Sequence, residues 1–89
     1  MNVPEDSLRE EEQLRNFIVD GLGWHGARTL LTDDYALIAN DVIDSLGIFE
    51  LVTYIESQYG IEIDDEELIL ENFATLSVMG RLVRAKGPA

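Results

Sequence analysis

The chain has 89 residues, a formal net charge of −12 and no cysteine. A chain of this length makes one small domain with a single modest core, and the lack of cysteine excludes disulfides and thiolate metal sites. The charge repels nucleic-acid phosphates and anionic membranes and favours basic protein surfaces as partners. Solubility alone is the alternative explanation for so many acids.

The apolar runs and the N-terminal residues predict a protein without a membrane-spanning segment or a signal peptide. No apolar run is long enough to span a bilayer. The range 1–6 is acidic where a signal peptide would be basic. We therefore expect a cytoplasmic protein with no nucleic-acid ligand and no membrane association.

The first helix is expected to begin near Leu8. Ser7, followed three residues later by Glu10, has the form of a capping box. One apolar stripe then recurs at helical spacing, and Gly21 ends the helix. The stripe consists of Leu14, Phe17, Ile18 and Leu22.

Residues 23–44 form a long connection, which is unusual in a small domain and often functional. Its apolar residues predict that it packs on the core, with Leu37 and Ile38 as the main anchors. These residues are Trp24, Leu30, Leu31, Tyr35, Leu37, Ile38, Val42 and Ile43. His25 is the only histidine, and without a second histidine or a cysteine we expect no metal or catalytic role for it.

A second helix is predicted over about 45–59. At 100° per residue its core face gathers on one arc. This arc holds Ile48, Leu51, Val52, Ile55 and Tyr59. Leu46 and Phe49 lie off the arc, beside Ser45, with Glu50 and Glu56 near them. Exposed apolar residues with acids around them usually mark a contact surface, and the alternative is that the long connection folds over them.

The segment after Gly60 is predicted to hold one brief third helix. Asp64 or Asp65 caps it, and it runs to about residue 70. In this interpretation Leu68 and Ile69 pack inward.

The last helix is predicted to begin after Thr75, which has a side chain suited to an N-cap. Phe73 is expected to enter the core just before it. The buried stripe of this helix consists of Leu76, Met79, Leu82 and Val83. The pattern as a whole predicts three main helices, one short helix and a long first loop.

Ser45 stands in the first turn of the second predicted helix. The backbone N–H groups of a first turn have no partner within the helix and favour a negative group, so a hydroxyl there is well placed to carry a phosphate. A catalytic serine would need a base and an oxyanion hole, and His25 has no reason to lie near. Neither Asp33-Asp34 nor the acids of 64–67 match the spacing of a calcium loop. We therefore expect a substrate of enzymes rather than an enzyme, and no metal.

The motif Asp44-Ser45-Leu46 resembles the acyl carrier protein family. The resemblance extends through the helix that follows, through Gly60–Glu67 and through Phe73–Leu76, and so covers nearly the whole chain. In that family the motif serine carries 4′-phosphopantetheine, which a separate phosphopantetheinyl transferase moves from coenzyme A. The resemblance implies an all-α, small four-helix carrier-protein bundle. It also implies a monomer, with a carrier domain over 7–86 between flexible tails 1–6 and 87–89.

The resemblance also assigns roles to single residues. Ser45 would bear the phosphopantetheine covalently, with Asp44 and Leu46 beside it. The residues that would dock partner enzymes are Asp41, Leu46, Phe49, Glu50 and Glu56. The implied partners are the transferase, an acyl- or aminoacyl-loading enzyme, and downstream synthase or tailoring enzymes.

Two departures from the family pattern narrow the function. Gly47 and Ile48 follow the motif, where fatty-acid carriers commonly have an acidic residue, and the range 71–76 looks more like carriers of specialised pathways. Three hypotheses follow: a free-standing acyl carrier, a peptidyl or aminoacyl carrier of the same fold, and an unmodified acidic helical docking module.

Overall fold

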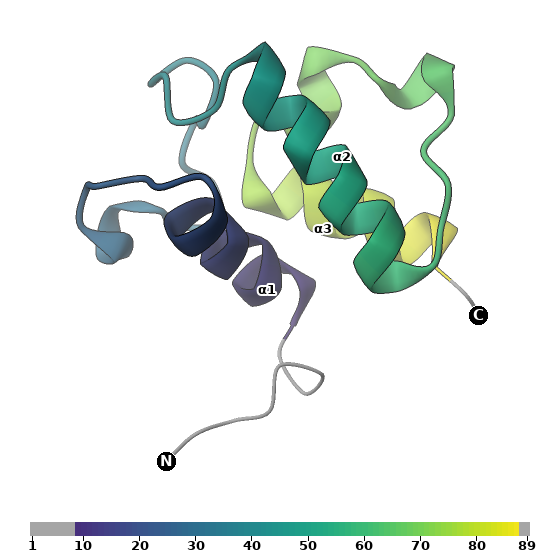
Figure 1. The fold of residues 1–89 in the computed structure, drawn as a ribbon, viewed down its shortest axis with the longest axis horizontal. Helices are drawn as coiled ribbons and strands as arrows, with labels where there is room; N and C mark the ends of the chain where they lie inside the picture. The colour runs from purple at the N-terminus through teal and green to yellow at the C-terminus, as the bar shows by residue number, and fades with distance from the viewer. Residues whose placement is uncertain (1–8, 88–89) are drawn as a thin grey trace.

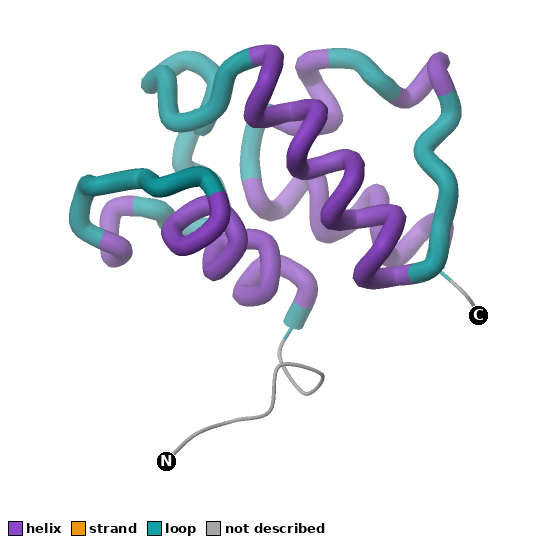
Figure 2. Tube along the Cα trace, viewed as in Figure 1, coloured by secondary structure: helices purple, strands orange, loops and turns teal. Residues whose placement is uncertain are grey.

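The computed structural model describes residues 9–87, which fold into helices and loops without any strand in that range (Figure 1). The three α-helices are α1 (Glu10–Asn16), α2 (Ser45–Tyr59) and α3 (Leu76–Lys86). The short helices between them are a π-helical segment, η2 (Phe17–Gly21), and three 3₁₀ turns, η3 (Arg28–Leu30), η4 (Asp65–Glu67) and η5 (Leu70–Phe73). Figure 2 shows how much of the connecting chain is loop. The all-α prediction is confirmed, and α2 has the predicted bounds.

One hydrophobic core joins all three α-helices. Its members come from α1 and η2, the long connection, α2, the 61–73 segment and α3. They are Leu14, Ile18, Leu31, Leu37, Ile43, Leu51, Ile55, Ile63, Phe73, Leu76, Met79 and Val83. The stripes predicted for the helices supply most of this cluster, as the helical periodicity requires. None of the helices within residues 9–87 is both long and apolar enough to cross a membrane.

The first helix continues into a π-helical segment that brings an aromatic ring close to a glycine. The helix is assigned from Glu10, and the predicted cap Ser7 and the predicted start Leu8 lie outside the described residues. In η2 the N–H of Leu22 donates to the carbonyl of Phe17 at 3.1 Å. A Cβ at Gly21 would lie 2.8 Å from the Phe17 ring, so this ring position requires glycine.

The long connection is tied to the start of α3 by backbone hydrogen bonds. The N–H of Leu37 donates to the carbonyl of Ala74, and the N–H of Ser77 donates to the carbonyl of Asp33, both at 2.9 Å. The packing prediction is wrong for Leu30, which is 53% exposed at the end of η3. Its neighbour Leu31 takes the core position instead.

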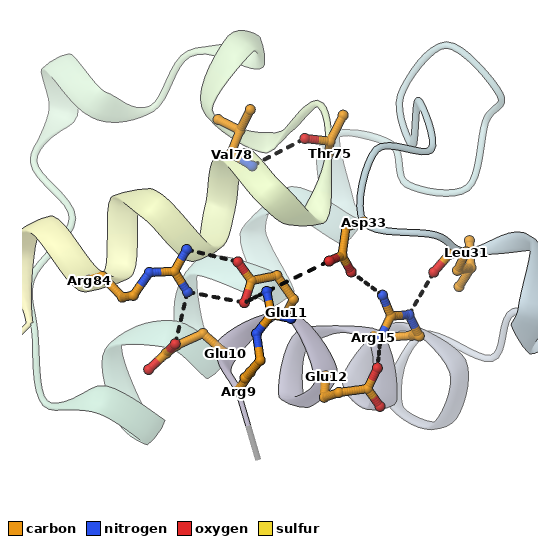
Figure 3. A network of polar contacts seen from close by, with 10 residues as sticks. All are labelled: Arg9, Glu10, Glu11, Glu12, Arg15, Leu31, Asp33, Thr75, Val78 and Arg84. Carbon is orange, nitrogen blue, oxygen red and sulfur yellow. Dashed lines mark hydrogen bonds and ion pairs between the residues drawn. The ribbon is translucent and has the colours of Figure 1, made fainter.

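Ion pairs fasten α1 to this connection (Figure 3). Arg15 donates from Nε to the carbonyl of Leu31 at 2.6 Å and pairs with Asp33 and Glu12. Arg9 also reaches Asp33, at 3.8 Å. Because Arg15 is largely buried, its guanidinium holds the connection against the helix in one geometry.

A second set of ion pairs fastens α1 to α3 (Figure 3). The carboxylate of Glu11 is buried and accepts two hydrogen bonds from Arg84, at 2.8 and 3.0 Å, while Glu10 accepts a third at 3.0 Å. These hydrogen bonds from Arg84 lower the pKa of Glu11 and raise that of Arg84. A Cβ at Gly80 would lie 2.4 Å from Oε2 of Glu11, so a side chain there would displace the carboxylate that Arg84 binds.

The segment between α2 and α3 differs from the prediction. Gly60 ends α2 in the left-handed conformation, with φ +65°, as expected. The single third helix is replaced by η4 and η5, and Leu68 and Ile69 are 45% and 46% exposed, so the prediction that they pack inward is wrong. Lys86 of α3 pairs with Glu67 at 2.7 Å, and this hydrogen bond raises the pKa of Lys86 and lowers that of Glu67. Of the three acids of η4, only Glu67 pairs with α3, while Asp65 and Glu66 are exposed, as are the aliphatic residues that follow.

Candidate functional site

Ser45 is exposed and is the first residue of α2. Asp44 precedes it in an extended conformation and caps the helix, because its Oδ1 accepts a hydrogen bond from the N–H of Gly47 at 2.9 Å. The carbonyl of Asp44 accepts from the N–H of Ile48 at 2.8 Å. Asp44 therefore accepts two hydrogen bonds, one on its side chain and one on its carbonyl, and these fix the first turn of α2, which contains Ser45.

Two large apolar side chains stand beside the serine without cover. Leu46 is 67% exposed and Phe49 is 74% exposed. The prediction that they lie off the core face is confirmed, and the long connection does not fold over them. Apolar residues exposed to this degree on a small domain indicate a surface that meets another molecule.

A small apolar pocket opens at Ser45. It has a volume of about 240 Å³ and is lined by Ile48, Phe49, Val52 and Leu68 in addition to the serine. Leu68 was not expected at this site, since the sequence pattern placed it in the core. In the structure it directly follows η4 and is 45% exposed.

The three acidic residues predicted for the docking face, Asp41, Glu50 and Glu56, do not stay together. Asp41 and Glu50 are exposed and line one groove of about 380 Å³, which Asp44 also lines. Glu56 does not join them, because it is half-buried and its carboxylate accepts a hydrogen bond from the N–H of Ile63 at 2.9 Å. The structure therefore gives Glu56 a structural role in holding the link after α2.

His25 is exposed in the long connection and is not part of this site. In the part of the chain that the structure describes, no group of three or more His, Asp or Glu residues is placed to hold a metal ion. No protein-family model matches the sequence.

Proposed function

We propose that the protein is a free-standing acyl carrier, with 4′-phosphopantetheine attached to Ser45 and an acyl group held on it as a thioester. The observation that carries the proposal is the exposed hydroxyl of Ser45 in the first turn of a 15-residue helix. The unpaired N–H groups and the dipole of that turn favour a phosphate. The resemblance of residues 44–46 and of the following segments to carrier proteins points the same way.

The attachment step follows from the chemistry of a serine hydroxyl. The Oγ of Ser45 would attack the phosphorus of coenzyme A that bears the pantetheine, and the bond from that phosphorus to the bridging oxygen of the pyrophosphate would break. Adenosine bisphosphate leaves with the bridging oxygen, and the serine proton passes to a base of the transferase. When bound, the arm would supply the thiol that this cysteine-free chain lacks.

The place of the single histidine supports a carrier rather than an enzyme. No histidine accompanies Ser45, because the single histidine of the chain lies exposed in the long connection.

We propose the four-helix carrier arrangement as well, with η4 and η5 together in the place of the third helix. Partners would be the transferase, a loading enzyme, and a synthase or tailoring enzyme that takes the cargo.

The pocket beside Ser45 favours an acyl cargo over an aminoacyl cargo. Apart from the serine, its lining is entirely apolar: Ile48, Phe49, Val52 and Leu68. Burying a charged ammonium group against such a lining would carry a desolvation cost that an aliphatic chain does not have. An aminoacyl or peptidyl carrier of the same fold is the second candidate.

The test is the intact mass after incubation with coenzyme A, magnesium and a broad-specificity phosphopantetheinyl transferase. The wild type should gain one arm, Ser45→Ala none, and the control Ser57→Ala, an exposed serine later in α2, should gain one. A wild type that stays unmodified would reject the carrier proposal and leave the unmodified docking module. Loading by an acyl ligase, but not by an amino-acid adenylating enzyme, would then support the acyl cargo.

A further inference from the structure

The segment 64–72, which contains η4 and leads into η5, contributes no side chain to the hydrophobic core. Ile63 before it and Phe73 after it are both buried, but none of the residues between them is a core member or an apolar residue packed on the core. Within the segment only Glu67 and Asn72 are half-buried, and the other residues are exposed. A segment with so few buried apolar contacts opens at a lower free-energy cost than the core does.

Polar contacts made by Glu67 hold this segment in place. The Nζ of Lys86 lies 2.7 Å from Oε1 of Glu67 and 3.5 Å from Oδ2 of Asp64. The same Oε1 accepts a hydrogen bond from the N–H of Asp64 at 2.9 Å, and the carbonyl of Glu67 accepts one from Nδ2 of Asn72 at 2.8 Å. Because Lys86 belongs to α3, the ion pair ties the segment to that helix.

The apolar pocket beside Ser45 has one wall that α2 does not supply. Apart from Leu68, every residue that lines the pocket belongs to α2. The spacing of the α2 residues is fixed, because they lie on one continuous helix of 15 residues. Leu68 directly follows Glu67, so the width of the pocket depends on where the segment 64–72 lies relative to α2.

We propose that Leu68 is a movable wall that decides which length of cargo the pocket shelters, and that Lys86 positions this wall through Glu67. The inference rests on the proposed function, since it takes an acyl chain on Ser45 as the occupant. At roughly 30 Å³ for a group the size of a water molecule, a pocket of about 240 Å³ holds about eight methylene groups. A shorter chain fits with the segment in its observed place. A longer chain requires Leu68 to move outward and the contacts of Glu67 to open.

The first test measures how readily the segment opens in the absence of cargo. The reporter is hydrogen exchange, followed by NMR, at the N–H of Asn72, which donates to the carbonyl of Ile69 at 3.0 Å. Lys86→Met should speed this exchange about 2- to 5-fold, the size expected for the loss of a partly exposed ion pair, and Lys86→Arg should restore most of the protection. Arg81→Met, at an exposed position of the same helix, is the matched control and should leave the rate unchanged. Equal effects of Lys86→Met and Arg81→Met would overturn the positioning role of Lys86.

The second test places a chain of known length at the position of the cargo without a transferase. The protein has no cysteine, so in Ser45→Cys an alkyl methanethiosulfonate attaches a butyl or a dodecyl chain at a single place, through a disulfide. Both chains should shift the methyl signals of Ile48 and Val52. The butyl chain should leave the exchange at Asn72 unchanged, whereas the dodecyl chain should speed it at least as much as Lys86→Met does. The same exchange rate with both chains would overturn a movable wall.

A pair of matched leucine variants separates the wall from a general loosening of the segment. Leu68 and Leu70 are 45% and 59% exposed, but only Leu68 lines the pocket. In Ser45→Cys with the dodecyl chain, Leu68→Ala should return the exchange at Asn72 to the rate of the same variant without a chain, because the shortened side chain leaves room. Leu70→Ala should retain the faster exchange, and equal behaviour of the two would reject Leu68 as the wall. None of these measurements uses the transferase, so failure of the carrier proposal, which the intact mass reveals, is distinguishable from failure of this one.

Discussion

Two acidic regions of this small protein use their carboxylates in opposite ways. Where α1 meets α3 and the long connection, the acids Glu10, Glu11, Glu12 and Asp33 all contact an arginine. Around the start of α2, among the residues that the structure describes, Asp41, Asp44 and Glu50 have no basic partner. The first group fixes the fold, and the second remains available to another molecule.

The two regions differ because the few arginine and lysine residues contact acids in the first region and not in the second. Ion pairs between residues of the described range 9–87 involve five of the six basic residues: Arg9, Arg15, Arg28, Arg84 and Lys86. None of these pairs involves an acid around the start of α2. Three of the acids without a basic partner among the described residues, Asp41, Asp44 and Glu50, therefore lie near the exposed Leu46 and Phe49. Acids placed in this way steer association with basic partners at a salt-dependent rate.

The largest expected effect contrasts the two sides of α2 itself. Ile55→Ala should lower the free energy of unfolding by roughly 2–5 kcal/mol, because Ile55 is fully buried. Glu50→Ala, on the exposed side, should change it by no more than about 0.5 kcal/mol. Denaturant unfolding of both variants measures this, and equal losses would mean that the two faces of α2 are assigned wrongly.

Removing the buried acid of the paired region should have the next largest effect. Glu11→Gln should destabilise the fold by about 2 kcal/mol at neutral pH, because Arg84 loses a charged hydrogen-bond partner but stays partly solvated.

The same variant should change the response to acid. Arg84 lowers the pKa of Glu11 in the folded protein below its ordinary value of 4.5, so the contribution is complete above that pH and is lost as the pH falls through the folded pKa. Urea unfolding over a pH series should show the curves of wild type and Glu11→Gln converging in acid. A constant separation would contradict a role for the charge of Glu11.

A further contrast lies between two glutamates of α2 that the sequence pattern treated alike. Glu56→Lys should cost about 1–2 kcal/mol of stability, because the N–H of the buried Ile63 loses its acceptor. Glu50→Lys should leave the stability unchanged and slow the modification of Ser45 by the transferase, most strongly at low salt. The measurements are thermal unfolding and the modification rate across a salt series. If Glu50→Lys is modified at the wild-type rate at low salt, the acids on this face do not steer the transferase.

The smallest expected effect concerns the cap beside Ser45. Asp44→Ala should destabilise the protein by about 1 kcal/mol and expose the Gly47 amide to faster hydrogen exchange, because the N–H of Gly47 loses its acceptor. Asp44→Asn keeps an acceptor at the same place and should retain most of the protection. Equal exchange rates in the two variants would show that the cap contributes nothing to α2.

Local patterns of the sequence were sufficient for α2 and for the start of α3. The bounds of α2, its stop at Gly60 and the cap of α3, where the side chain of Thr75 accepts from the N–H of Val78 at 3.1 Å, all follow the prediction. The exposure of Phe49 follows as well, because helical periodicity alone decides which face of α2 a residue occupies. These features depend on interactions between residues only a few positions apart, so the local sequence is enough to predict them.

Only the tertiary structure decided which charges and which aliphatic residues face the solvent. Glu11 is buried because Arg84, 73 positions later, reaches it across Gly80. Leu68 lies exposed beside Ser45 instead of packing inward. Glu56 is half-buried, and its carboxylate accepts a hydrogen bond from the N–H of Ile63, which follows α2. The amino-acid sequence states how many acids the protein has, but the packing of distant segments decides which of them meet a basic residue. Within the range 9–87, that packing leaves Asp41, Asp44 and Glu50 without an ion pair around the start of α2.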